Sequence, residues 1–256
     1  MKIALSALAA MAALCSFPAA SSAGEAAMPD GFVYLRQVDA TIAQDMRYAA
    51  PDNFTGRPVP GYEAAECVLT APAARALSRV QADLKPMGLG LKVFDCYRPE
   101  RAVRAFVEWT GAPEDAASRR AYHPDVRKAA LMPGYIASRS GHSRGAAVDL
   151  TLVVPDGEPA KLSSPHACEH AGASADATNE IDMGTPFDCF DPLSATRAPG
   201  IGKTRKASRQ ALVSAMKRHG FRNYSAEWWH FSFSPEPYPK RYFDFPIRPL
   251  PAKPAE

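Results

Sequence analysis

The amino-acid sequence predicts a single α+β domain with a central, mostly antiparallel sheet flanked by helices. Three segments have the short, apolar and β-branched or aromatic character of strands, at 89–97, 146–154 and 228–233. Helical patterns separate them, but strands and helices do not alternate in the regular order that builds a parallel sheet. A chain of 256 residues, 46% of them hydrophobic, is long enough for one domain with a substantial core.

Apolar residues at helical spacing predict three helices, at 71–85, 99–111 and 207–218. Thr70 stands where a side chain can cap the first helix. Pro99 is tolerated in the first turn of the second, because the N–H that it lacks would be unpaired there anyway. Gly220 ends the third. Elsewhere we expect a further short strand at 32–38 and loops at 48–62, at 112–138 with helical turns, and at 155–180.

Composition and charge argue against several classes of protein. The chain has 30 basic and 27 acidic residues, a net charge of +3, with the two signs mixed along the sequence. No basic stripe is present, so we expect no nucleic-acid partner. Beyond the N-terminal segment, no apolar run is long enough to span a membrane, which needs about 20 residues. No sequence feature specifies an oligomeric state.

The first 23 residues have the pattern of an export signal. Lys2 supplies the positive start, residues 3–14 form an apolar run, and Ser21-Ser22-Ala23 offers small residues for cleavage. The alternatives are a membrane anchor or a buried helix, but the run is shorter than the about 20 residues that cross a bilayer. A leucine precedes Cys15, where a lipid-modified cysteine would follow a small residue. We therefore predict a periplasmic or secreted protein whose mature chain begins near Gly24.

Export would leave four cysteines in an oxidising compartment, where we expect two disulfide bonds. Four cysteines allow three connectivities, and sequence alone does not choose between them. We favour the pairs nearest in sequence, Cys67–Cys96 and Cys168–Cys189. A thiolate metal site is disfavoured because no CxxC pair exists, and a thiol nucleophile is the weaker alternative because a better site lies elsewhere.

Two of the six histidines lie in settings that indicate chemistry. His142 follows a glycine and precedes a predicted strand that carries a lone carboxylate, Asp149, among Ala, Val and Leu. A charged group in a buried apolar strand is costly unless it is paired or bound to a metal. Glu227 and His230 lie together at the start of another apolar strand.

These four residues match what a zinc hydrolase needs. Catalytic zinc takes three protein ligands and keeps one position for water, whose pKa it lowers to about 7. His142, Asp149 and His230 would ligate the metal, and Glu227 would take the proton from the water. Residues three apart face opposite ways on a regular strand, so we expect Glu227 at a bend before the strand.

The alternative interpretation is two packed histidines and two ion-paired acids. Taken singly, His-x6-Asp and Glu-x2-His are weak patterns that favour this interpretation. Their joint occurrence, each next to small or aromatic residues at the edge of a predicted strand, favours a metal site instead. The HExxH helix of common zinc proteases is absent.

These segments resemble the zinc D-alanyl-D-alanine dipeptidases of the VanX type, within a wider group of peptidoglycan D,D-carboxypeptidases. The wider group's pattern, SxHxxGxAxD followed by ExxH, is matched by Ser140, His142, Gly145, Ala147, Asp149, Glu227 and His230. The dipeptidase motifs are matched by Tyr48-Ala49, Asn53 to Gly56, Tyr97-Arg98-Pro99, Met183-Gly184, Phe187-Asp188, Glu227 to His230 and Tyr242 to Pro246. The similarity spans about residues 33–247, nearly all of the mature chain, and its motifs together are highly specific.

The resemblance implies an exported zinc metallopeptidase that hydrolyses the D-Ala-D-Ala dipeptide by attack of a zinc-bound water. One Zn²⁺ per chain would be held by His142, Asp149 and His230, and Glu227 would be the general base. Arg98 would stabilise the oxyanion that forms at the attacked carbonyl.

The resemblance also implies how the substrate is held. Its substrate-contacting residues correspond to Tyr48, Ser140 and Asp188, of which Asp188 would pair with the free ammonium of the dipeptide. Arg139 and Arg144, with Arg98, would favour a C-terminal carboxylate, unless the first two belong to a solvated surface. The chain then divides into a signal peptide at 1–23, a zinc D,D-dipeptidase domain at 24–247 and a Pro-rich tail at 248–256.

The chain departs from the resemblance in two places. Residues 155–182 are longer than expected, and this insertion could reshape the mouth of the pocket. It carries three candidate metal ligands, His166, Cys168 and His170. We interpret them as part of a surface loop rather than as a second metal site. Cys96 stands where the family often has glycine, and an export-specific disulfide could join it to Cys67.

Two other functions remain open. One is a D,D-carboxypeptidase that trims the terminal D-Ala from peptidoglycan stem peptides. Such an enzyme would need an open cleft and no anionic group to bind a free amine. The other is a metal-stabilised cell-wall binding module on an inactive peptidase fold. The retained Glu227 and Arg98 argue against this module, because binding needs neither. Export fits wall turnover better than protection from a glycopeptide, for which the precursor pool is cytosolic.

Overall fold

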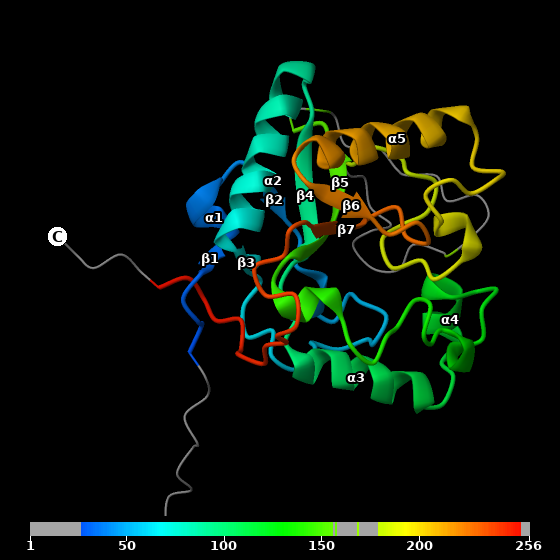
Figure 1. Ribbon diagram of the computed structural model, residues 1–256. Helices are drawn as coiled ribbons and strands as arrows, with labels where there is room; N and C mark the ends of the chain where they lie inside the picture. The colour runs from blue at the N-terminus through cyan, green and yellow to red at the C-terminus, as the bar shows by residue number, and fades with distance from the viewer. Residues whose placement is uncertain (1–26, 156, 158–167, 169–178, 252–256) are drawn as a thin grey trace, which may run out of the picture.

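Five strands form the central sheet of the computed structural model, which describes residues 27–155, 157, 168 and 179–251 (Figure 1). In spatial order they are β2 (Ala43–Gln44), β4 (Gly90–Asp95), β5 (Ala147–Val153), β7 (His230–Phe233) and β6 (Phe221–Asn223). β2 pairs with β4 in parallel, and the other neighbours pair antiparallel. The predicted α+β fold with a mostly antiparallel sheet is confirmed.

The three strands at the centre of this sheet, β4, β5 and β7, are the ones predicted from sequence. β7 begins at His230, two residues later than predicted, because Trp228 and Trp229 belong to the turn before it. The strand predicted at 32–38 is half wrong. Phe32–Tyr34 is strand β1, which pairs with β3 (Val68–Thr70), but Leu35–Val38 is helix α1. Strands β2, β3 and β6 have only two or three residues, too few for side-chain alternation to predict.

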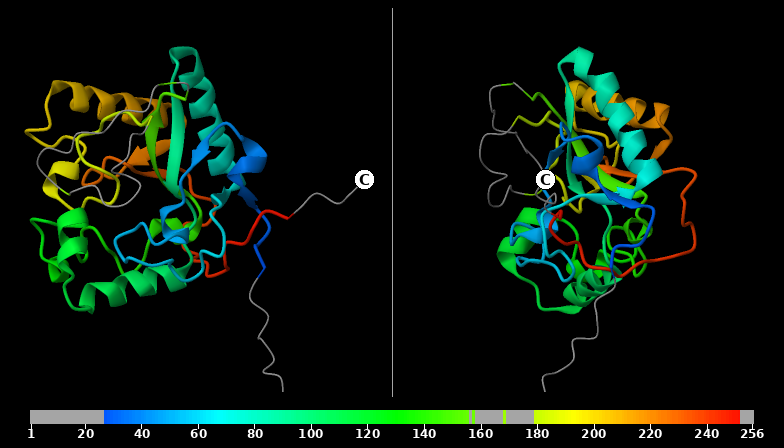
Figure 2. Two further views of the ribbon diagram at one scale, coloured as in Figure 1. Left: turned by 180° about the vertical axis from the view of Figure 1, so that it is seen from behind. Right: turned by 90° about the vertical axis from the view of Figure 1, so that its left-hand side faces the viewer.

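All three predicted helices are present, as α2 (Ala71–Leu84), α3 (Glu100–Gly111) and α5 (Lys203–Arg218). α5 begins four residues before its predicted start, and α4 (Ala116–Tyr122) lies in the loop expected to contain helical turns. The predicted side-chain cap is wrong: Thr70 precedes α2, but its hydroxyl makes no hydrogen bond. α2 and α5 lie together over one face of the sheet, whereas α3 and α4 lie at its lower end in the view of Figure 1 (Figures 1 and 2).

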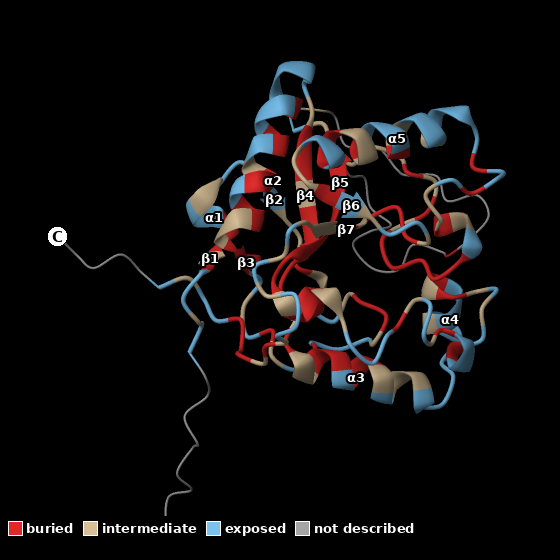
Figure 3. Cartoon of the chain, in the orientation of Figure 1, coloured by how far each residue is buried: buried red, intermediate tan, exposed pale blue. Residues whose placement is uncertain are grey.

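Burial of the central strands limits the charge that they can carry. All seven residues of β5 are buried, and Figure 3 shows that α2 and α5 are buried mainly on the side facing the sheet. Neighbouring apolar side chains such as Leu91, Val93 and Leu150 are fully buried. Asp149 lies in the middle of this strand, so its carboxylate needs partners within the fold.

Both favoured disulfide bonds are present. Cys67–Cys96 joins the residue before β3 to the residue after β4, and Cys168–Cys189 is buried beside Leu193. The bonded pairs are therefore those nearest in sequence, and the four cysteines build neither a thiolate metal site nor a thiol nucleophile.

Several sequence predictions lie outside the described residues. They concern the signal at 1–23, His166 and His170 of the insertion, and residues 252–256 of the tail. Within the described part of the chain, no helix combines the length and the apolar character that crossing a membrane requires.

Candidate metal centre

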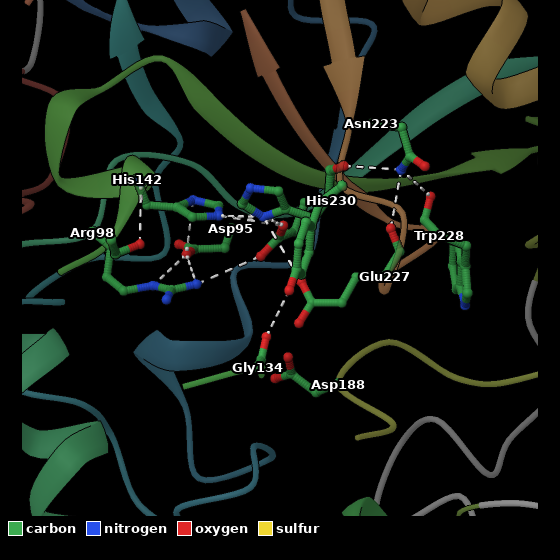
Figure 4. Close-up of polar contacts among 12 residues, drawn as sticks. Asp95, Arg98, Gly134, His142, Asp188, Asn223, Glu227, Trp228 and His230 are labelled. Atoms are coloured by element: carbon green, nitrogen blue, oxygen red, sulfur yellow. Dashed lines mark hydrogen bonds and ion pairs between the residues drawn. The ribbon is translucent and has the colours of Figure 1, made fainter. Parts of the chain in front are cut away.

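Three neighbouring strands place acidic and imidazole groups side by side. Asp149 of β5 lies directly opposite His230 of β7 on one side and directly opposite Asp95 of β4 on the other. Because opposite residues share one face of a sheet, the three side chains form a row. Figure 4 shows the polar contacts around this row, with Asp95 and His230 labelled.

His142 reaches the row from a 3₁₀ turn, Gly141–Arg144, that lies just before β5. The Ser140 hydroxyl oxygen caps this turn by accepting a hydrogen bond from the His142 backbone N–H at 3.2 Å. Gly145 ends the turn in the left-handed region, at φ +71°. A Cβ atom at this position would overlap the Phe32 ring, so only glycine fits. The turn thereby aims the imidazole at the row.

The side chains of His142, Asp149 and His230 converge on one point. His142 Nε2 lies 3.1 Å from His230 Nδ1 and 3.3 Å from Asp149 Oδ1, and His230 Nδ1 lies 2.9 Å from Asp149 Oδ1. Ligand atoms bound tetrahedrally to zinc at about 2.0–2.1 Å are about 3.3 Å from one another. Two nitrogens and one oxygen at these separations fit a zinc ion and leave its fourth position to water or substrate.

The contacts behind these atoms favour the forms that bind a metal. His142 Nδ1 faces the Cys96 carbonyl oxygen at 2.6 Å, so Nδ1 carries the proton and Nε2 the free lone pair. Burial lowers the pKa of His230, which favours the neutral imidazole. Burial alone would raise the pKa of Asp149, but the His142 and His230 rings outweigh it and lower this pKa, so the side chain is a carboxylate.

Glu227 lies at a bend before β7, as its spacing from His230 predicts. The Asn223 side-chain amide holds this bend by donating to the backbone carbonyl oxygens of Glu227 and His230, each at 3.0 Å (Figure 4). Glu227 Oε2 is 4.0 Å from His230 Nδ1, so it lies beside the ligand atoms rather than among them. Burial, with Asp149 and Asp188 nearby, raises the pKa of Glu227 well above its usual value.

Arg98 brings a guanidinium to the same place. Its Nε and Nη2 each lie 2.9 Å from Asp95 Oδ2, and Nη2 is 3.6 Å from Asp149 Oδ2. The guanidinium also lies over the rings of Tyr48 and Phe106, 5.3 and 5.0 Å from their centres. Burial alone would lower the pKa of Arg98, but Asp95, with the smaller contributions of Tyr48, Tyr62 and Asp149, outweighs it and raises this pKa, so the group stays charged.

Tyr48 and Asp188 form a second polar group in the site. The Tyr48 hydroxyl donates to Asp188 Oδ2 at 2.9 Å, and both side chains are buried. Asp188 has a φ of +60°, which is uncommon for a residue with a side chain and tends to occur at functional sites. Burial, followed by the charge of Asp149, raises the pKa of Asp188 well above its usual value.

One cavity of about 220 Å³ gathers every site residue predicted from sequence. They are Tyr48, Arg98, Ser140, His142, Asp149, Asp188, Glu227 and His230. The rings of Phe54, Phe106 and Trp229 supply apolar lining, and Arg139 lines the cavity next to Ser140. The site is therefore a small pocket lined both by polar groups and by aromatic rings.

Sequence reasoning missed three residues that contact the site from outside the cavity. Asp95 contacts Arg98, Tyr62 donates to Asp95 Oδ1 at 2.6 Å, and Asn223 holds the bend at Glu227. The sequence does carry a signal for Asp95, which is a lone carboxylate in an apolar strand as Asp149 is. Asn223 leaves no such signal, because asparagine is ordinary near turns.

This arrangement is that of a metal-dependent hydrolase. A divalent ion between two imidazoles and a carboxylate can polarise a carbonyl and activate water. A carboxylate beside the ligand atoms can move a proton, and a guanidinium in the same pocket can stabilise developing negative charge.

Similarity to known proteins shows which family of metal-dependent hydrolases the chain belongs to. The model of the M15 peptidase family described as D-ala-D-ala dipeptidase matches residues 28–165 and 160–248. A D-alanyl-D-alanine dipeptidase of Enterococcus faecium is 37% identical over 222 residues, which cover 86% of this chain and 100% of that protein. One of Streptomyces coelicolor is 38% identical over 222 residues, with the same 86% and 100% coverage. The chain belongs to this D-ala-D-ala dipeptidase family of M15 peptidases.

A solved structure is also similar to part of the chain. It is that of a mutant of the vancomycin-resistance D,D-pentapeptidase VanY in complex with Zn(II), and it covers 75% of this chain and 86% of its own at 15% identity. The TM-score of 0.34 is too low for this alignment to support a conclusion about fold or site.

We predict that the purified protein holds one zinc ion per chain and that His230→Ala loses it, because a catalytic zinc site needs all three protein ligands. Elemental mass spectrometry after gel filtration measures the metal content. His219→Ala is the matched control, since His219 pairs with Asp83 and does not line the cavity. Equal zinc in the two variants would contradict the assignment of His230 as a ligand.

Proposed function

We propose that the protein is an exported zinc dipeptidase that hydrolyses D-Ala-D-Ala to two molecules of D-alanine. One observation carries this proposal: a single small cavity joins the metal-binding group to Asp188, a carboxylate suited to a free ammonium. The names of the relatives from Enterococcus faecium and Streptomyces coelicolor support the same substrate.

A zinc ion held by His142, Asp149 and His230 would act as a Lewis acid and lower the pKa of a water molecule to about 7. Glu227 then serves as the general base, because its carboxylate lies beside the ligand atoms, within reach of that water's proton. The same carboxyl group can return the proton to the nitrogen of the leaving D-alanine. The peptide bond then breaks with a neutral amine as the leaving group.

Arg98 would stabilise the negative charge that develops on the attacked carbonyl oxygen. Two of its nitrogens are already hydrogen-bonded to Asp95, so the guanidinium is in place before a substrate arrives. A hydrogen-bond donor that is already in place does not have to reorganise, so it stabilises the charge of the transition state more than a mobile donor does. Glu227 and Arg98 together favour an enzyme over a wall-binding module, because binding alone needs neither.

Asp188 would select the dipeptide over a longer stem peptide. Its carboxylate, held by the Tyr48 hydroxyl, would pair with the ammonium of D-Ala-D-Ala. A stem peptide carries an uncharged amide at that point, so it would not form the ion pair with the buried Asp188 that the ammonium of the dipeptide would form. Dipeptidase activity is therefore the leading assignment and D,D-carboxypeptidase activity the alternative.

We predict that the zinc-loaded protein converts D-Ala-D-Ala to D-alanine and that Glu227→Gln lowers kcat by about 100- to 10,000-fold, the usual contribution of a general base. Gln keeps the shape of the side chain but cannot take the proton, so zinc content should stay unchanged. Chromatography of the products and elemental analysis of the protein measure the two quantities.

Glu63→Gln is the matched control for this variant, since Glu63 pairs with Arg248 and neither lines the cavity. A pentapeptide stem is the second substrate. Cleavage of the stem alone would overturn the dipeptidase assignment. Full turnover by zinc-loaded E227Q would rule out Glu227 as the base, and capture of wall fragments without hydrolysis would favour a binding module.

Arg139 is the arginine best placed to bind the C-terminal carboxylate of the substrate. Arg98 is already engaged in an ion pair with Asp95, and Arg144 forms an ion pair with Glu236. Arg139 lines the cavity, with its guanidinium 4.8 Å from the centre of the Tyr242 ring. An aromatic ring orients a cation without neutralising it, so this guanidinium can still attract an anion.

We predict that Arg139→Gln raises KM for D-Ala-D-Ala by about 10-fold or more, as expected for a lost hydrogen bond between charged groups. KM for the C-terminal amide of the dipeptide should not change, because that substrate has no carboxylate. Arg241→Gln is the control, since Arg241 lies over the Phe243 ring at 4.6 Å but does not line the cavity. An equal rise in KM for both substrates would show that Arg139 does not recognise the carboxylate.

We further propose export to the periplasm or to the medium. The pattern of residues 1–23 supports it, as do the two disulfide bonds, which persist in oxidising compartments. An exported enzyme would meet wall fragments rather than cytosolic precursors, which fits wall turnover. The full-length chain produced in a bacterium should appear outside the cytosol, beginning near Gly24 and without free thiols. Uncleaved protein in the cytosol would contradict export.

A further inference from the structure

Asp95 lies at the centre of a hydrogen-bond network next to the site (Figure 4), and its side chain is completely buried. Oδ1 accepts from the Tyr62 hydroxyl at 2.6 Å, and Oδ2 accepts from Arg98 Nε and Nη2, both at 2.9 Å. Oδ2 also lies 3.3 Å from His142 Nδ1. A single carboxylate therefore contacts both a metal-site imidazole and the guanidinium that the proposed function assigns to the oxyanion.

A β-bulge puts Asp95 in this position. The register between β4 and β5 shifts just before Asp95, because β4 has one extra residue, Phe94, at that point. In regular pairing Phe94 would lie opposite Asp149, and the Asp95 carboxylate would point to the other face of the sheet. Phe94 instead stacks on the Phe187 ring, with centres 4.7 Å apart. The bulge thus turns the carboxylate toward the metal-binding row.

We propose that Asp95 is a positioning residue that holds the Arg98 guanidinium at a fixed place relative to the His142 imidazole. The inference rests on the proposed function, since it explains how the oxyanion donor and the metal ligand keep their spacing. Both groups lie against the same oxygen, Oδ2, with Arg98 Nη2 at 2.9 Å and His142 Nδ1 at 3.3 Å, so this oxygen sets the spacing between them. Donors held in place before charge develops need no reorganisation during the reaction.

Asp95→Asn separates the charge of this residue from its shape. The amide oxygen can still face Arg98, and the amide NH₂ can donate to the Tyr62 hydroxyl oxygen, so the packing is kept. His142 Nδ1 also keeps its acceptor, the Cys96 carbonyl oxygen at 2.6 Å. The variant should therefore fold, but it holds Arg98 by a weaker contact because the negative charge is gone.

For D95N we expect kcat on D-Ala-D-Ala to fall by about 10- to 100-fold, the usual effect of losing an outer partner of a metal site. KM should change little, because Arg98 acts in the transition state rather than in substrate binding. The Kd for zinc, measured by competition with a chelating dye, should rise by about 10-fold or more.

Tyr62→Phe is the matched control. It removes the hydrogen bond from Tyr62 to the same buried carboxylate and the contact of Tyr62 with Arg98, but it keeps the ion pair between Asp95 and Arg98 and the contact of Asp95 with His142. Its kcat and zinc Kd should stay within about fivefold of the wild type, the effect of one neutral hydrogen bond. A merely structural role of Asp95 would make D95N and Y62F alike, and that result would overturn the proposal.

A double-mutant cycle tests whether Asp95 acts through Arg98. D95N should lower kcat much less when Arg98→Met is already present, because the group that Asp95 positions is then missing. Additive losses would overturn the proposal.

If D95N fails to fold, Asp95→Glu replaces it. This variant keeps the charge but moves it by one methylene, so kcat should still fall by about 10-fold. An undiminished kcat would contradict a positioning role.

Failure of the proposed function is a different result. If the wild type leaves D-Ala-D-Ala intact, the dipeptidase assignment falls, whereas the zinc Kd values of D95N and Y62F still test the contact between Asp95 and His142. Equal Kd values for these two variants would then overturn the inference.

Discussion

A buried carboxylate on a central strand is the constraint on which the rest of the structure depends. Asp149 lies in a strand with all seven residues buried, where an unpaired charge would cost several kcal/mol. The fold surrounds it with the imidazoles of His142 and His230 and with the guanidinium of Arg98. These groups come from a glycine-ended turn before the strand, from the neighbouring strand β7 and from the segment that follows β4. The contacts that stabilise the carboxylate are the same ones that produce a metal-binding geometry.

The charges around the cavity explain why a divalent cation belongs in it. Asp95, Asp149, Asp188 and Glu227 are all buried, and Arg98 lies among them. Burial and the repulsion between carboxylates raise the pKa of Asp188 and of Glu227, so these two groups tend to keep their protons. A zinc ion would add two positive charges next to Asp149 and favour the ionised form of Glu227. The positive charge of a bound zinc ion would therefore also keep Glu227 ionised, which is the form that acts as a general base.

The sequence allows prediction of those parts of the fold and of the site that show a recognisable local pattern of residues. Asp149 stands out as a charge in an apolar strand, and the spacing of Glu227 and His230 predicts the bend that the structure has. Asp95 carries the same mark as Asp149, but regular alternation along its strand gives the wrong face, and only pairing with β5 reveals the bulge. Asn223 acts through backbone atoms of residues that follow it, which no spacing predicts. The edge strands β2 and β6 are too short to leave a pattern, and the substrate-contacting roles proposed for Tyr48, Ser140 and Asp188 rest on the family resemblance.

The most direct test of this account is a crystal structure of the zinc-loaded protein, with diffraction data recorded on both sides of the zinc absorption edge. We expect one anomalous peak at about 2.0–2.2 Å from His142 Nε2, His230 Nδ1 and the Asp149 carboxylate. Glu227 should lie next to the ion without binding it. A peak elsewhere in the molecule, or an ion that takes Glu227 as a ligand, would contradict the account.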